Sequence, residues 1–215
     1  MKEDWENDIA LAKAVGIDGF ALNFAGDLYT EYQMNLAYDA AEKLGDFGLF
    51  LSIDYEANHY NPQFVQFTDP AVVTQWITRY KDRMAQVKVN GQALVSTFEG
   101  AKSAGDWKGI KQDTTCFFVP VWTSAKGSPD TFTNADGAMG WDVWPYGPTG
   151  ISTMVDDDWK TLLGSRPYMM GVAPWFYTNL PDAGKNWLWR GDNLWHDRWQ
   201  QVIEVQPSFV EVSLT

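Results

Sequence analysis

Short apolar segments of strand length alternate along the whole chain with segments of helical periodicity. The strand-like segments cover residues 18–24, 47–54, 92–100, 114–122, 137–144, 168–176 and 209–214. Between them, apolar residues recur at helical spacing, for example over residues 30–44 and from Pro70 onward. Strands that are apolar on both faces and separated by helices are typical of a parallel sheet covered by helices. The alternation therefore predicts an α/β fold.

Two α/β architectures remain open at this point, the doubly wound sheet and the barrel. No GxGxxG turn follows the first strand-like segment and no GxSxG elbow is present, so the motifs that favour a doubly wound enzyme are missing. A chain of 215 residues is long enough for one sizeable core. We predict a single TIM-type (β/α)8 barrel over residues 1–215, incomplete by one strand, with an open doubly wound sheet as the alternative.

Charge and composition exclude several classes of protein. The net charge of −12 disfavours nucleic acid as a partner, because binding to phosphates needs clustered Lys and Arg. Cys116 is the one cysteine, and the two histidines, His59 and His196, have no companion ligands at zinc spacing. No metal site is predicted. No apolar stretch reaches the roughly 18 residues of a membrane helix, and no signal peptide follows Met1.

Chemistry-bearing side chains gather where the predicted strands end. Active sites of such barrels lie at the C-terminal ends of the strands. The residues there are Asn23, Asp54, Glu99, Trp122, Trp141, Asp142, Trp144, Trp175, Tyr177 and Asn179. A sugar ring presents flat C–H faces that stack on aromatic rings and hydroxyls that bind carboxylates and amides. Glycoside hydrolysis in addition needs two carboxyl groups across the scissile bond.

Each of these residues also has a purely structural interpretation. Asp54 and Glu99 can each be a solvated strand-end carboxylate or a helix cap, and a single Trp is more often a core residue than a platform. The run Asp156–Asp158 is predicted to cap and start the helix that contains Trp159, without a catalytic role. The Trp-rich segment 179–193 is long for a barrel connection, which favours a loop that faces substrate.

Several motifs occur together in one order, and they resemble a known family. They read "GIDGFALN", "LFLSIDYE", "VSTFEG", "CFFVPVW", "PWFYTNLP" and "KNWLWRGDNLWHDRWQQVIEVQPSFVEV". This series resembles the fungal α-1,3-glucanases, or mutanases, of glycoside hydrolase family 71 over nearly the whole chain. The resemblance implies a (β/α)8 barrel that hydrolyses α-1,3-glucan of cell walls with inversion, without a metal or organic cofactor. It further implies that Asp54 is catalytic and that the other strand-end residues line the glucan groove.

The sequence also departs from the family pattern. In the family, the last strand continues into a W-N-D-Y-G-E motif that carries the expected acid and base, whereas "FVEV" is followed here by "SLT". The family's first strand precedes the tryptophan that matches Trp5, and Val121 stands where the family has an aspartate. We therefore expect a barrel that lacks its first strand and the end of its last βα unit, and a truncated chain that is inactive or nearly so.

Three functional hypotheses follow. The first is an endo-1,3-α-glucosidase of family 71 in truncated form, and the second is a non-catalytic glucan-binding relic of such an enzyme. The third is a glycosidase of other linkage specificity that works with Asp54 and Glu99 alone. The resemblance implies a polysaccharide-binding protein outside the cell or in the cell wall, although the chain itself shows no signal peptide. We further expect a monomer that binds no membrane.

Overall fold

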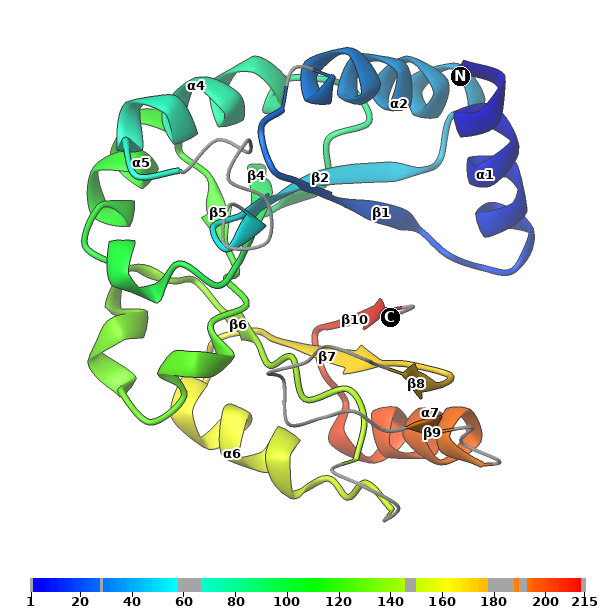
Figure 1. Ribbon diagram of the computed structural model, residues 1–215, viewed down its shortest axis with the longest axis vertical. Coiled ribbons are helices and arrows are strands. Elements are labelled where there is room, and N and C mark those ends of the chain that lie inside the picture. Colours follow the sequence, from blue (N-terminus) through cyan, green and yellow to red (C-terminus); the bar gives the residue numbers. More distant parts are fainter. Residues whose placement is uncertain are drawn as a thin grey trace. The chain divides into compact units, whose positions relative to one another are not determined.

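The computed structural model describes residues 2–27, 29–57, 67–145, 150–177, 188–189 and 193–213. They form two compact units, one of Met1–Pro120 with Thr131–Ala135 and one of Val121–Asp130 with Asp136–Thr215. Each unit is built on parallel strands joined by helices, which confirms the predicted α/β class (Figure 1). The expectation that the whole chain forms one incomplete (β/α)8 barrel stays a prediction.

The first unit contains a parallel sheet of four strands with a short antiparallel addition. Its strands run in the order β1-β2-β4-β5, and β3 pairs antiparallel with β4. The elements are α1 (Lys2–Ala14), β1 (Gly19–Phe24), α2 (Thr30–Leu44), β2 (Gly48–Asp54), α4 (Pro70–Tyr80), β3 (Lys88–Val89), β4 (Gln92–Phe98), η1 (Ala101–Ser103), α5 (Trp107–Thr114) and β5 (Phe117–Phe118). The parallel register aligns the C-terminal ends of β1, β2 and β4 at one edge.

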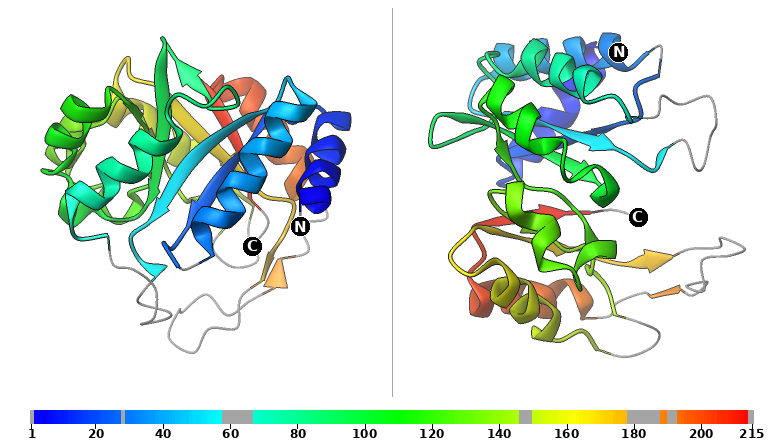
Figure 2. Two further views of the ribbon diagram at one scale, coloured as in Figure 1. Left: turned by 90° about the horizontal axis from the view of Figure 1, so that it is seen from above. Right: turned by 90° about the vertical axis from the view of Figure 1, so that its left-hand side faces the viewer.

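Helices α2 and α4 cover one face of this sheet (Figure 2). Their inner stripes are apolar, and the ring of Tyr38 on α2 stacks on Tyr80 of α4 with the ring centres 4.9 Å apart. From the sheet, Phe24 packs against Trp76 of α4 at 5.0 Å between ring centres. Helix α4 begins at Pro70, where the Asp69 carboxylate accepts a hydrogen bond from the backbone N–H of Ala71. Burial of this apolar interface holds the sheet and its helices together.

The second unit contains a three-stranded parallel sheet in the order β10-β7-β6 and a separate two-stranded antiparallel pair of β8 and β9. An isolated parallel bridge joins Val121 to Met139. The elements are η2 (Thr123–Ala125), β6 (Ala138–Met139), α6 (Met154–Leu163), β7 (Tyr168–Val172), β8 (Phe176–Tyr177), β9 (Leu188–Trp189), α7 (Leu194–Val205) and β10 (Phe209–Val212). The 3-10 segment η3 (Pro129–Asn134) contributes its first two residues to this unit and the others to the first unit.

Each of the seven predicted strands contains a regular strand, but several are shorter than predicted. β5 keeps only Phe117–Phe118 of residues 114–122, and β6 keeps only Ala138–Met139 of residues 137–144. Pro120 has no N–H to donate to a neighbouring strand. After β6, the backbone N–H of Trp141 donates instead to the hydroxyl of Thr123 at 2.7 Å. Local side-chain and proline effects therefore end these ladders early.

The prediction that the Asp156–Asp158 run caps a helix is wrong for Asp156. Helix α6 begins before the run, at Met154, and its N-cap residue Thr153 makes no capping hydrogen bond. Asp156 is fully buried and forms a two-pronged pair with Arg198 of α7, with N–O distances of 2.7 and 2.8 Å. The phenol of Tyr168 on β7 donates to the same carboxylate at 2.8 Å. A buried ion pair needs such complete bonding to offset its lost hydration.

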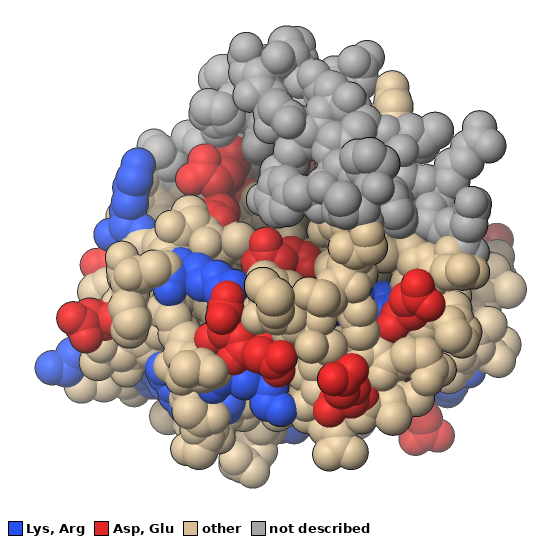
Figure 3. Space-filling model, turned by 90° about the horizontal axis from the view of Figure 1, so that it is seen from below, with Lys and Arg blue, Asp and Glu red and all other residues tan. Residues whose placement is uncertain are grey.

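The surface of the described residues carries mixed charge. Figure 3 shows acidic and basic side chains interspersed on one face of the molecule. In the described part of the chain, no helix is long and apolar enough to cross a membrane.

Candidate active site

Two carboxyl-bearing residues and an amide lie at the C-terminal ends of neighbouring strands in the first unit. Asn23 on β1 pairs in register with Ser52 on β2, and Asp54 at the end of β2 pairs with Phe98 on β4. Glu99 is the next residue after Phe98. The backbone N–H of Tyr55 donates to the carbonyl of Phe98 at 3.1 Å, which ties the two strand ends together. The parallel register thus brings Asp54 and Glu99 to one edge, as the strand pattern predicts.

Asp54 is half-buried, and its carboxyl has an unusual environment for an aspartate. Burial raises the pKa of Asp54, and the negative charge of Glu56 adds to this rise. Hydrogen bonds from the backbone amides of Glu56 and Ala57 act in the opposite direction, the first at 2.9 Å to Oδ1. A strand-end carboxyl with a raised pKa that is held by backbone amides keeps its proton more readily than an ordinary aspartate.

Glu99 occupies a constrained turn. Its φ is +50°, and Gly100 follows with a φ of +93°, so two consecutive residues are in the left-handed region. A Cβ on Gly100 would overlap the ring of Tyr55, which packs directly against the glycine backbone. Burial also raises the pKa of the Tyr55 phenol, so the ring stays neutral. This turn fixes the direction in which the chain leaves β4 and hence the position of Glu99.

The aromatic residues predicted at the strand ends of the second unit differ widely in exposure. Trp175 and Tyr177 are exposed by 48% and 56%, whereas Trp122 is fully buried and Trp144 is exposed by 8%. Trp144 stacks on Phe176 at 4.2 Å and meets the partly exposed Trp141 edge-on at 6.2 Å. Trp122 and Trp144 are core side chains in this structure, and their contact with glucan stays a prediction.

Asp142 is partly exposed and has a partner on α6. Its Oδ2 accepts a hydrogen bond from the indole N–H of Trp159 at 3.4 Å. Trp159 itself packs against Gly140, where a side chain on the glycine would overlap the indole. Asp142 therefore orients a buried ring, and a role toward substrate stays a prediction. Asn179 and most of segment 179–193 lie outside the described residues.

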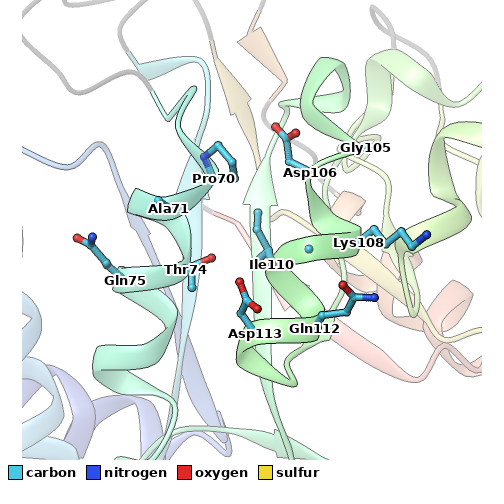
Figure 4. A pocket seen from close by; sticks show the side chains of 11 residues that line it. Pro70, Ala71, Thr74, Gln75, Gly105, Asp106, Lys108, Ile110, Gln112 and Asp113 are labelled. Atoms are coloured by element: carbon cyan, nitrogen blue, oxygen red, sulfur yellow. The ribbon is translucent and has the colours of Figure 1, made fainter.

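A groove between α4 and α5 lies on the helix side of the first unit. It has a volume of about 720 Å³, and Thr74 and Ile110 face each other across it (Figure 4). Its lining contains no aromatic ring: Pro70, Ala71, Thr74, Gln75, Gly105, Asp106, Lys108, Gly109, Ile110, Gln112 and Asp113. Without rings it offers no stacking surface for a sugar. In the described part of the chain, no group of three His, Cys, Asp or Glu side chains is placed to hold a metal ion.

The sequence did not predict two features of the second unit, a buried ion pair and a buried acid. The buried pair of Asp156 and Arg198 joins residues that are 42 positions apart, and no local sequence pattern predicts such a pair. Glu211 lies on β10 beside Gly171 of β7, and burial raises its pKa to about 7. The position of Glu211 in the apolar strand "FVEV" indicates an unusual carboxyl, because burial of a charged acid in such a strand is energetically unfavourable.

The described fold is similar to that of two solved structures. A GH99 endo-α-mannosidase from Bacteroides thetaiotaomicron has a similar structure, with a TM-score of 0.73 and 15% sequence identity over 99% of this chain and 70% of that one. A mandelate racemase/muconate lactonizing enzyme is more distantly similar, with a TM-score of 0.54, 15% identity and 49% of its length covered. At these identities the similarity concerns the fold alone.

The chain belongs to glycosyl hydrolase family 71, whose model matches residues 1–214. A mutanase of Penicillium rubens is 35% identical over 222 residues, which cover 98% of this chain and 47% of the relative. A glucan endo-1,3-alpha-glucosidase of Schizosaccharomyces pombe is 34% identical, with 97% and 51% covered. An ascus wall endo-1,3-alpha-glucanase of the same yeast is 28% identical, with 98% and 51% covered. The chain thus spans about half the length of these relatives, and the resemblance inferred from the motifs is confirmed.

Proposed function

We propose that this chain carries a catalytic carboxyl and the glucan-binding strand ends of an endo-1,3-α-glucosidase built on a (β/α)8 barrel. The observation that supports this most is the half-buried Asp54, whose raised pKa and backbone hydrogen bonds accompany a second carboxyl, Glu99, on the neighbouring strand. Exposed aromatic rings of the second unit, Trp175 and Tyr177, supply stacking surfaces of the kind that sugars need. We infer the α-1,3 linkage of the substrate from the family relatives, two of which are named as an endo-1,3-alpha-glucosidase and an endo-1,3-alpha-glucanase.

The chemistry that this arrangement supports is acid and base catalysis. In an inverting hydrolysis, the acid donates its proton to the glycosidic oxygen as the bond from C1 to that oxygen breaks. The base takes a proton from the water whose oxygen forms the new bond to C1 on the opposite face. Asp54 suits the acid, because burial favours its protonated form. Glu99, on the adjacent strand end, is the carboxyl that we assign to the base.

The partners and location belong to the same proposal. The substrate is the α-1,3-glucan of cell walls, and the protein acts outside the cell or in the wall as a monomer. The remaining predicted contacts to glucan are Asn23, Trp122, Trp141, Asp142, Trp144 and Asn179.

Retention on insoluble α-1,3-glucan and the release of reducing ends are the two measurements that test the proposal. We expect the chain to bind α-1,3-glucan, to release reducing ends from it only weakly, and to leave β-1,3- and α-1,4-glucan intact. Asp54→Asn should keep the binding and lower the release by about 100-fold or more, because it removes an acid. Asp46→Asn is the matched control, since Asp46 precedes the opposite end of the same strand and is exposed.

The outcomes separate the three hypotheses. Retention without release in the unaltered chain would contradict the catalytic part and support a glucan-binding protein. Release of reducing ends only from a glucan of another linkage would support a different glycosidase that uses Asp54 and Glu99. The position of these two residues at adjacent strand ends is the observation that favours this alternative. No retention on α-1,3-glucan would contradict the proposed substrate.

A further inference from the structure

A row of polar side chains crosses three strands of the first unit directly below Asp54. Asn23 on β1 pairs with Ser52 on β2, and Ser52 pairs with Ser96 on β4. Residues paired in this way point to the same face of the sheet. The neighbouring row of Phe24, Ile53 and Thr97 points to the other face, where Phe24 packs against α4. The polar row therefore lies on the face away from α4.

The members of this row are buried progressively from β1 to β4. Asn23 is exposed and its Nδ2 donates to the hydroxyl of Ser52 at 3.3 Å, whereas Ser52 is exposed by 7% and Ser96 by 1%. The Ser96 hydroxyl has no hydrogen-bond partner among the described residues. A buried hydroxyl without a partner is costly, and such groups in native proteins are most often satisfied by ordered water.

Asp54 lies on the same face, two residues beyond Ser52. Two residues along a strand span about 6.6 Å, which is too far for a direct hydrogen bond and close to the span of two bonds through one water. We propose that Asn23, Ser52 and Ser96 are positioning residues that bind an ordered water beneath Asp54 and, through it, hold the Asp54 carboxyl. Ser96 donates its hydroxyl proton to the water, and the water donates to the carboxylate.

The catalytic consequence of this inference rests on the proposed function, because Asp54 is the carboxyl that we assign to the acid. The water-mediated bond stabilises the charged form of Asp54 and thus opposes the effect of burial. Two further sets of groups act on this carboxyl. The charge of Glu56 raises the pKa of Asp54, and the backbone amides of Glu56 and Ala57 lower it. The polar row sets how strongly Asp54 holds its proton.

The titration of Asp54 tests the inference without any glucan. The full chain labelled with ¹³C at aspartate carboxyls is titrated by NMR, and the Asp54 signal is assigned by its loss in Asp54→Asn. We expect Ser96→Ala to raise the pKa of Asp54 by about one unit, the worth of one hydrogen bond to a charged group. Ser52→Ala should shift it in the same direction, and Ser96→Thr, which keeps a hydroxyl, should restore the original value.

Thr97→Val is the matched control. Thr97 is the next residue on β4, is fully buried, and also has a hydroxyl without a partner among the described residues, but it points to the opposite face. Its loss should leave the Asp54 titration unchanged. Equal titration curves for Ser96→Ala, Ser52→Ala and Thr97→Val would overturn the inference. A shifted titration in a chain that leaves α-1,3-glucan intact would support the polar row and contradict only the proposed function.

Discussion

At the residue scale, the turn after β4 shows how a single glycine positions a candidate catalytic group. Gly100 has a φ of +93° and lies against the ring of Tyr55. Both its backbone conformation and the space beside it therefore require a glycine. Glu99, just before it, adopts a φ of +50°, which a glutamate adopts at a cost of about 1 kcal/mol or more. The surrounding packing of Tyr55 offsets this cost and keeps Glu99 in one place.

Gly100→Ala should therefore destabilise the chain. Both the left-handed backbone and the overlap with Tyr55 oppose a methyl group, and we expect a loss of about 1–3 kcal/mol in the free energy of unfolding. Glucan hydrolysis should fall as Glu99 shifts. Urea denaturation measures the first effect and reducing-end release the second.

Gly109→Ala serves as the control for that substitution. Gly109 lies within α5, and a Cβ there meets nothing within 4 Å. Alanine in a helix interior should stabilise the chain by about 0.5–1 kcal/mol. If the two variants changed stability alike, the constraint that we assign to the Gly100 turn would be wrong.

At the scale of elements, the buried pair of Asp156 and Arg198 fixes two helices to one strand. Arg198 of α7 binds Asp156 of α6 and donates through Nε to the carbonyl of Gly171 on β7 at 3.2 Å. Tyr168 of the same strand binds the Asp156 carboxylate. Since both residues lie in the first half of their helices, the pair secures the starts of α6 and α7.

Asp156→Asn should destabilise the chain by about 3–5 kcal/mol, because it leaves the Arg198 charge buried without a counter-ion. Asp158→Asn is its matched control in the same helix and the same acidic run. The Asp158 side chain is 71% exposed and pairs with Lys126 at the surface, so its loss should change the free energy of unfolding by less than about 1 kcal/mol. Chemical denaturation of both variants distinguishes the two effects, and equal changes would contradict a special role for Asp156.

The β3–β4 hairpin had a sequence signal that the prediction did not use. Asn90 and Gly91 have φ values of +52° and +80°, as expected where an Asn-Gly pair joins two antiparallel strands. The rule was available from the residues alone. The buried pair of Asp156 and Arg198 is different, because no rule of local sequence selects one aspartate out of three.

At the scale of the whole molecule, Glu211 links stability to pH. Burial raises its pKa from 4.5 to about 7. Between these values the folded chain holds a proton that the unfolded chain has released, so the stabilising contribution of the protonated form is lost as pH rises through this window. The folded chain should therefore lose stability between about pH 5 and pH 7 and change little from this group above pH 7.

Glu211→Gln should remove this component of the pH dependence. We expect the Tm of the unaltered chain to fall more between pH 5.5 and pH 8 than the Tm of the variant, with a difference in unfolding free energy of up to about 3 kcal/mol. Glu204→Gln, at an exposed position of α7, should follow the unaltered chain. If Tm changed with pH in the same way for all three proteins, Glu211 would not have the raised pKa on which this prediction rests.

The sequence by itself determined the α/β class, the seven strand positions, the family and the strand-end location of Asp54 and Glu99. All of these depend on local periodicity, on motif order or on the rule that parallel strands end at one edge. Tertiary structure alone decided that Trp122 and Trp144 are buried while Trp175 and Tyr177 are exposed. It also decided that Asp156 faces inward and that Ser52 and Ser96 form a row beneath Asp54. Burial and register depend on residues distant in sequence, which no local pattern contains.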